Sequence, residues 1–237
     1  MVKLFYVNSF PRSGNTWLRM MLIDLLSPHV FDQNPIFSQT SSGCWKAEHP
    51  RINAEECRRD ICIVKSHGKY ETCIKDIPII YLIRDGRDSM YSYYHFNLDH
   101  RGYEESWDSY FRRVVVDRQL SGFREEYLDA WMGTWSENCL SYMGKSNVLP
   151  LFYEKLRSET LLSLITLFNF LGIDCVPVDQ MKATIGKFEE QLSQKKKNHE
   201  RPRGATGGWR DVYTPEQRML FWHRHGSCLE LLGYEKQ

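Results

Sequence analysis

The sequence predicts a single α/β domain over residues 1–237, with three layers (α/β/α) and a mainly parallel central sheet. Short apolar runs at 4–7, 61–64, 78–83 and 148–152 alternate with longer segments of helical pattern. Such runs are typical of parallel strands that helices cover on both faces. The first run passes through small polar residues directly into a helix. This order predicts a P-loop-like anion-binding loop.

The bulk properties exclude several classes of protein. A formal net charge of +1 gives no global field that would attract nucleic acid or a membrane surface. No apolar run is long enough to cross a bilayer. The first strand begins near residue 3 and leaves no room for a signal peptide, so we expect a cytoplasmic protein. Seven dispersed cysteines without a C-x-x-C pair predict buried thiols rather than disulfides or a metal site.

The loop after the first strand has the composition of an anion site. Pro11 ends the strand because it has no N–H for the ladder, and Gly14 lets the backbone approach a ligand closely. Arg12 adds a positive charge, and the helix over 17–26 directs its N-terminus at the same place. The loop lacks the Gly-Lys-Ser/Thr ending of a Walker A sequence, which argues against an ordinary nucleoside triphosphatase.

The next two strands end in candidate functional residues. Lys65 and His67 are two positions apart on an extended segment, so their side chains point the same way, as a catalytic pair would. Arg84 ends the third strand, and Ser92 on the following helix can converge with it on one anion. Asp88 is predicted to cap that helix.

Between these motifs and residue 193 the sequence predicts an irregular segment and several helices. Residues 28–60 are expected to be irregular, either covering a substrate or forming a disordered excursion. A helix is predicted over 123–143, with an aromatic stripe that belongs to the core. Further helices are predicted over 156–171, ended by Gly172, and over 178–193.

The C-terminal part begins with a strongly basic segment. Residues 195–210 contain six lysines or arginines and one glutamate, interleaved with glycines and Trp209. This composition favours a flap that grips phosphate over a merely solvated charged face. Thr214, Pro215 and Gln217 then form a strong helix start for a helix that runs to about residue 232.

Several of these segments together resemble one family, the sulfotransferases that use 3′-phosphoadenosine-5′-phosphosulfate (PAPS). Residues 10–17 are similar to the family's phosphosulfate-binding loop, and 84–96 to its 3′-phosphate motif, with the arginine and the serine eight positions later. Residues 203–210 are similar to the C-terminal flap. Lys65-Ser66-His67 and the Leu-Phe-Tyr-Glu run at 151–154 match further family segments, in family order.

The resemblance implies a role for each matching residue. His67 would be the general base, and Lys65 and Arg12 would stabilise charge on the transferring group. The other implied contacts fall into three groups. The 5′-phosphosulfate would be held by Arg12, Ser13, Gly14, Asn15 and Thr16, the adenine by Trp17 and Tyr153, and the 3′-phosphate by Arg84, Ser92, Arg203 and Gly204. Candidate acceptor contacts are Phe10, Trp45, His67, Tyr93 and Phe96.

The chain also departs from the family pattern. Arg12 replaces the usual lysine of the loop; a guanidinium can brace an oxygen by charge but is a poor proton donor. Pro202 replaces a flap arginine, for which Arg201 compensates from one position earlier. The short dimer motif of the animal cytosolic enzymes is not matched, so the sequence predicts no oligomeric state. The Ser-Gly-Asn-Thr-Trp spelling is closer to bacterial sulfotransferases that tailor natural products.

The resemblance therefore implies transfer of the sulfuryl group from PAPS, leaving 3′-phosphoadenosine 5′-phosphate (PAP). The acceptor would be a hydroxyl, amine or amide of a small molecule. The reaction needs no metal, and we expect neither nucleic acid nor a membrane as a partner. Two alternatives stay open at this point. One is an ATP-dependent small-molecule or nucleotide kinase with an atypical phosphate loop, and the other is a non-catalytic binder of 3′-phosphorylated adenosine nucleotides.

Overall fold

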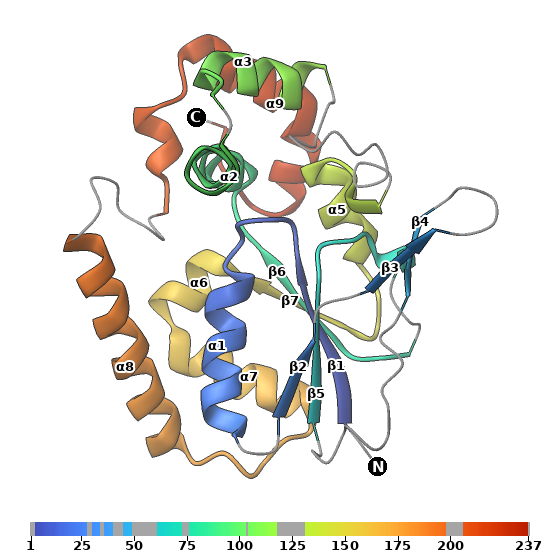
Figure 1. The fold of residues 1–237 in the computed structure, drawn as a ribbon, viewed down its shortest axis with the longest axis vertical. Coiled ribbons are helices and arrows are strands. Elements are labelled where there is room, and N and C mark those ends of the chain that lie inside the picture. Colours follow the sequence, from blue (N-terminus) through green and yellow to red (C-terminus); the bar gives the residue numbers. More distant parts are fainter. Residues whose placement is uncertain are drawn as a thin grey trace.

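A parallel sheet forms the centre of the computed structural model (Figure 1). Its strand order is β2-β5-β1-β6-β7, and each neighbouring pair is parallel. The strands are β1 (Lys3–Ser9), β2 (Val30–Gln33), β5 (Ile61–Ser66), β6 (Ile79–Ile83) and β7 (Val148–Phe152). The structure describes residues 3–27, 30–33, 36–39, 45–48, 61–72, 76–102, 104–117, 131–197 and 206–236.

Helices cover both faces of this sheet (Figure 1). One face is covered by α1 (Asn15–Leu26), α6 (Tyr153–Ser158), α7 (Thr160–Leu171) and α8 (Val178–Lys197). The other is covered by α2 (Gly86–Arg101), α3 (Trp107–Phe111), α5 (Trp135–Tyr142) and α9 (Pro215–Leu231). Short helical turns are η1 (Tyr70–Thr72), the π-helical η2 (Arg112–Val116) and η3 (Gly208–Asp211). The predicted α/β fold with a parallel sheet is confirmed.

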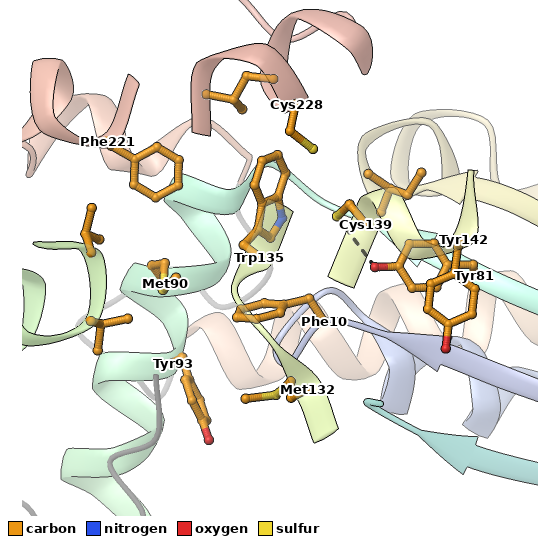
Figure 2. Close-up of a cluster of buried hydrophobic side chains, with 14 of the residues drawn as sticks. Phe10, Tyr81, Met90, Tyr93, Met132, Trp135, Cys139, Tyr142, Phe221 and Cys228 are labelled. Atoms are coloured by element: carbon orange, nitrogen blue, oxygen red, sulfur yellow. Dashed lines mark hydrogen bonds between the residues drawn. The ribbon is translucent and has the colours of Figure 1, made fainter. Parts of the chain in front are cut away.

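Side chains of the central strands alternate between two hydrophobic clusters. In β6, Ile79, Tyr81 and Ile83 face the α2/α5/α9 side, whereas Ile80 and Leu82 face the α1/α7 side. The strands β1 and β5 alternate in the same way. Because the side-chain period of a strand is two, a sheet whose successive residues are all buried must have a layer on each face. Figure 2 shows part of the α2/α5/α9 cluster.

The segment 28–60 contains strands where the sequence predicted irregular structure. The edge strand β2 pairs with β5 through the register from Val30 to Gln33. A separate antiparallel pair consists of β3 (Ile36–Gln39) and β4 (Trp45–Glu48). Pairing with β2 gives hydrogen-bond partners to the second edge of β5, which local sequence does not reveal. The other residues of this segment lie outside the described part.

The helix predicted over 123–143 is not continuous. Within its described part, Gly133 has a φ of 67°, and Thr134 is the N-cap of α5. Thr134 and Glu137 form a reciprocal capping box, which starts a new helix at this point. The helix predicted over 156–171 is likewise divided into α6 and α7 at Glu159, whose φ of −132° is not helical.

Other boundaries follow the sequence signals. Gly172 ends α7 in the left-handed conformation with a φ of 58°. Thr214 and Gln217 form the capping box of α9, with Pro215 in its first turn. Pro150 lies in β7, which is an edge strand of the described sheet, as its missing N–H predicts. In the part of the chain that the structure describes, no helix has the length and apolar character needed to cross a bilayer.

Candidate active site

A cavity of about 410 Å³ opens at the carboxyl ends of the central strands in the described structure. In a parallel sheet, ligands bind at this edge, next to the strand from which the strand order departs in two directions. Here that strand is β1, with β5 on one side and β6 on the other. Twelve of the predicted site residues line this cavity: Arg12, Gly14, Asn15, Thr16, Trp17, Lys65, His67, Arg84, Ser92, Tyr93, Phe96 and Tyr153.

The loop between β1 and α1 has an unusual backbone. Arg12 has a φ of 66° and Gly14 a φ of 93°, both in the left-handed region. A Cβ atom at Gly14 would lie 2.5 Å from Cδ2 of Tyr153, so only glycine fits against this ring. The Nη1 atom of Arg84 donates to the carbonyl oxygen of Arg12 at 2.7 Å. The loop is therefore held by residues that follow β6 and β7.

The loop is also fixed from α1 and α2. The side-chain Nδ2 atom of Asn15 donates to the carbonyl oxygen of Val7 at 2.9 Å, across the loop. The hydroxyls of Ser13 and Ser89 are 3.4 Å apart and buried. Gly14 is the N-cap of α1 and offers no side-chain cap, so amides of the first turn are available to an anion.

The charged side chains that line the described cavity are all cationic: Arg12, Lys65 and Arg84. The Nε of Arg12 donates to Oγ of Ser92 at 3.2 Å, and its guanidinium lies 4.9 Å from the centre of the Phe96 ring. Arg84 is buried and stacks on the ring of Tyr153 at 4.8 Å. Together with the helix N-terminus, these cations make the cavity a site for a multiply charged anion.

His67 lines the cavity directly after β5. Its Nδ1 atom is 2.8 Å from the carbonyl oxygen of Ser9. A carbonyl oxygen can only accept a hydrogen bond, so Nδ1 donates, and Nε2 of the neutral ring carries the lone pair. Burial, followed by the charge of Lys65, lowers the pKa of His67 to about 4. The imidazole is therefore neutral near pH 7 and can accept a proton at Nε2.

One part of the cavity wall is aromatic and apolar. Tyr93 and Phe96 come from α2, Trp131 and Met132 precede α5, and Leu192 comes from α8. The aromatic stripe predicted over 123–143 is thus only partly in the core. Trp135 is fully buried in the core, as expected, whereas Trp131 reaches the cavity.

Asp88 does not cap α2, contrary to the sequence-based prediction. The N-cap is Asp85, whose carboxylate accepts from the backbone N–H of Arg87. The carboxylate of Asp88 instead accepts from the N–H of Gly207 at 2.6 Å and from that of Trp209 at 3.0 Å. Because Gly207 and Trp209 are 119 and 121 residues away, no local pattern reveals this partner.

Some predicted site residues lie elsewhere. Phe10 is buried in the hydrophobic cluster between Trp135 and Met132 and does not line the cavity (Figure 2). Ser13 is also buried and does not line the cavity. Trp45 begins β4, but its side chain is outside the described part. The flap residues Arg201, Arg203 and Gly204 also lie outside the described residues.

Sequence reasoning missed several residues of the site. Trp131 and Met132 were assigned to a continuous helix, although the Thr-x-x-Glu signal at Thr134 marks a helix start just after them. Leu192 lies far along the chain and carries no local signal. The described residues also contain no group of three or more His, Cys, Asp or Glu side chains that could hold a metal ion.

A parallel α/β fold whose cationic cavity adjoins a neutral histidine is the arrangement expected of a protein that binds an anionic ligand. The Sulfotransferase domain family matches residues 5–223. The chain belongs to this sulfotransferase family.

Individual relatives agree with this assignment. The chain is 28% identical over 207 residues to cytosolic sulfotransferase 7 of Arabidopsis thaliana, which covers 78% of this chain and 60% of the relative. It is 24% identical over 245 residues to cytosolic sulfotransferase 1 of Danio rerio, covering 91% of this chain and 79% of the relative. The match to the Arabidopsis protein thus spans less than two thirds of that protein's length.

A solved structure shows the shared fold. The structure of mouse sulfotransferase SULT7A1 complexed with PAP superposes with a TM-score of 0.69 at 23% identity, covering 98% of this chain and 88% of that chain. The family predicted from the sequence motifs is confirmed.

Proposed function

We propose that the protein transfers the sulfuryl group of PAPS to a hydroxyl, amine or amide of a small-molecule acceptor. The observation that carries this proposal is the cavity at the carboxyl ends of the strands, where three cations and a helix N-terminus adjoin a neutral His67. This arrangement supplies what an in-line transfer of a charged group needs, namely positioning and cations at the developing charge.

The residues present fit a donor with two separate anionic groups. Arg12 and the amides of the first turn of α1 belong to the same loop and suit the 5′-phosphosulfate. Arg84 and Ser92 suit the 3′-phosphate, and Trp17 and Tyr153 offer ring surfaces for the adenine. The close fit of Tyr153 against Gly14 supports this division, because it sets a ring directly beside the loop.

In the reaction that we propose, the acceptor oxygen or nitrogen forms a bond to sulfur while the bond from sulfur to the bridging oxygen breaks. Nε2 of His67 takes the proton of the acceptor, and the electron pair of the broken bond stays on the departing phosphate. Lys65 and Arg12 stabilise charge on the sulfuryl oxygens and on the leaving phosphate. A guanidinium is a poor proton donor, so Arg12 acts by charge.

The acceptor side of the proposal rests on the apolar wall. Tyr93, Phe96, Trp131 and Met132 line the cavity together with His67. Such a wall favours an acceptor with an uncharged ring or hydrocarbon body that presents one nucleophilic group. A cytoplasmic location and a place in natural-product biosynthesis stay predictions from the sequence.

Nucleotide binding tests the donor. We expect calorimetry without Mg²⁺ to show that PAP binds more tightly than 5′-AMP, ADP or ATP. We expect Arg84→Ala to weaken PAP binding by about 10- to 100-fold, the usual effect of losing a charge-assisted hydrogen bond, and to weaken 5′-AMP binding less, because 5′-AMP has no 3′-phosphate and loses only the support that Arg84 gives to the loop and to Tyr153. Arg113→Ala is a matched control, because Arg113 pairs with Glu105 and does not line the cavity.

Transfer itself is measured with radiolabelled PAPS and a panel of 2-naphthol, cyclohexanol and aniline. Equal or tighter binding of ATP, with Mg²⁺-dependent phosphoryl transfer to the panel, would instead show a kinase. Tight PAP binding without turnover on any acceptor would show a non-catalytic binder.

A further inference from the structure

We propose that Asn138 is a positioning residue that fixes the general base His67 against the acceptor wall of the cavity. This inference rests on the proposed function, because it assigns a role relative to His67. Asn138 lies on α5, outside the cavity lining, and its side chain is completely buried. A buried amide at such a place needs partners for its donors and its acceptor.

Each group of this amide has a partner. The Nδ2 atom donates to the carbonyl oxygen of His67 at 3.0 Å and to that of Met132 at 2.7 Å. The Oδ1 atom accepts from the hydroxyl of Tyr81 at 2.7 Å. Because the two backbone carbonyls can only accept, the NH₂ group must face them, and the Oδ1 atom then faces the hydroxyl of Tyr81. One side chain thus joins the end of β5 to the segment before α5.

The two carbonyls belong to residues that have different roles in the proposed reaction. His67 carries the base, and Met132 contributes to the apolar wall where we place the acceptor. A proton transfer depends on the distance and angle between the base and the acceptor group. A bond from one rigid amide to both backbones sets that geometry before any ligand binds.

Further buried hydrogen bonds hold the backbone next to His67. The hydroxyl of Tyr142 donates to the carbonyl of Gly68 at 2.7 Å, and the amide of Asn8 donates to the same oxygen at 3.3 Å. Tyr142 stacks on Tyr81, with ring centres 3.9 Å apart, beside Cys139 (Figure 2). The ring of His67 is then anchored at Nδ1 by the carbonyl of Ser9. These contacts hold the turn after β5 and make the orientation of its carbonyls definite.

The helix α5 also reaches the anion side of the cavity. Nε1 of Trp135 donates to the carbonyl oxygen of Arg84 at 3.1 Å. Thr134 and Glu137 fix the start of the helix through their capping box. Two residues on neighbouring turns of this short helix therefore hold the backbone on both sides of the cavity. Trp135 binds the carbonyl of Arg84, and Asn138 binds the carbonyl of His67.

The experiment compares Asn138→Ala with a matched control, Asn147→Ala. Asn147 makes the same kinds of bonds, with Nδ2 donating to the carbonyl of Ile77 at 2.8 Å and Oδ1 accepting from Tyr70 at 3.0 Å. It does not line the cavity. We expect Asn138→Ala to lower kcat on the best acceptor of the panel by about 10- to 100-fold, the effect of a displacement of about 1 Å. The Kd for PAP should stay within about twofold, and Asn147→Ala should lower only the melting temperature.

A second readout needs no acceptor. Nitrogen NMR of the imidazole in the full protein reports the pKa and the tautomer of His67. When the backbone of His67 is released, its ring becomes more hydrated, so in Asn138→Ala we expect the pKa to rise from about 4 toward the ordinary value near 6.5. Tyr81→Phe keeps the amide but removes the hydrogen bond to its Oδ1 atom, and we expect a smaller change in the same direction. This variant decides the question if Asn138→Ala does not fold.

The possible failures are distinguishable. If His67→Ala keeps wild-type turnover, the base of the proposed function is wrong. If His67→Ala is inactive while Asn138→Ala and Tyr81→Phe match the Asn147→Ala control in kcat and in the pKa of His67, only the positioning role is overturned.

Discussion

At the scale of single residues, the proposed chemistry depends on the hydrogen bond that Nδ1 of His67 makes. The carbonyl of Ser9 holds the proton on Nδ1, which leaves Nε2 as the acceptor. Burial and the charge of Lys65 keep the ring neutral. These two effects together keep His67 neutral at neutral pH and in the tautomer that the proposed proton transfer needs.

This environment predicts the pH dependence of the reaction. A histidine with a lowered pKa is neutral above that pKa, so kcat/KM should stay level from pH 8 to about pH 5 and fall only toward pH 4. The profile is measured with PAPS and the best acceptor of the panel. His67→Ala should abolish turnover and retain PAP binding. An acidic limb near the ordinary value of about 6.5, or an active His67→Ala, would contradict the prediction.

The sequence predicts some of these residues and not others for a physical reason. Lys65 and His67 lie on one side of an extended segment, so a period of two was enough to place both at the cavity. Asn138 is 71 residues from the carbonyl that it binds. Its contribution depends on tertiary packing of α5 against β5 and β6, which no local pattern encodes.

At the scale of elements, the structure attaches the C-terminal segment to the start of α2. The two oxygens of Asp88 accept from the amides of Gly207 and Trp209, and the guanidinium of Arg87 lies 3.8 Å from the ring centre of Trp209. The hydroxyl of Tyr213 donates to the carbonyl of Arg87 at 3.0 Å. The predicted 3′-phosphate motif and the end of the predicted flap are thus joined directly.

This attachment predicts an effect on nucleotide affinity. In Asp88→Asn, an NH₂ group replaces one of the two acceptor oxygens and faces a backbone N–H. We expect PAP binding to weaken by about tenfold or more, because Arg203 and Gly204 lie only a few residues before Gly207, while 5′-AMP binding changes little. Calorimetry measures both ligands. Asp179→Asn is the control, since Asp179 is exposed and pairs with Lys182 only on the surface. Unchanged PAP affinity in Asp88→Asn would show that this attachment does not position the flap.

Element boundaries were predictable where a cap or a glycine marks them. Gly172 and the Thr214–Gln217 capping box ended and began helices as expected. The break before α5 was missed because the aromatic spacing of 123–143 outweighed the Thr134–Glu137 signal. The strand β2 was missed because it exists by pairing with β5, a tertiary interaction.

At the scale of the whole molecule, the alternation of buried strand residues was sufficient to predict the layers. Each central strand shares its side chains between two clusters, which requires helices on both faces. The same layering buries polar groups that the sequence alone could not place. One such group is His225 of α9, which is 3% exposed. Its Nδ1 atom lies 2.5 Å from Oγ of Ser136 on α5.

Two histidines with a lowered pKa, His67 and His225, predict how global stability depends on pH. Burial lowers the pKa of His225 to about 3, and that of His67 is lowered to about 4. Both values are below the unfolded value of about 6.5, so between these limits the unfolded chain binds more protons than the folded chain. The stability that they contribute is complete above pH 6.5 and is lost as the pH falls toward 3. Each histidine gives the free energy of unfolding a slope of about 1.4 kcal/mol per pH unit within its window.

Urea unfolding at several values of pH measures this slope, and the variant His225→Gln tests its origin. Glutamine keeps a polar group near Ser136 but does not titrate. We expect the variant to be less stable at pH 7 and to lose roughly half of the slope between pH 6 and pH 5, while His67→Gln removes the other half. A slope that is the same in the wild type and in both variants would mean that acid unfolds the protein through its carboxylates, and that α9 is not held to α5 by a histidine that must stay neutral.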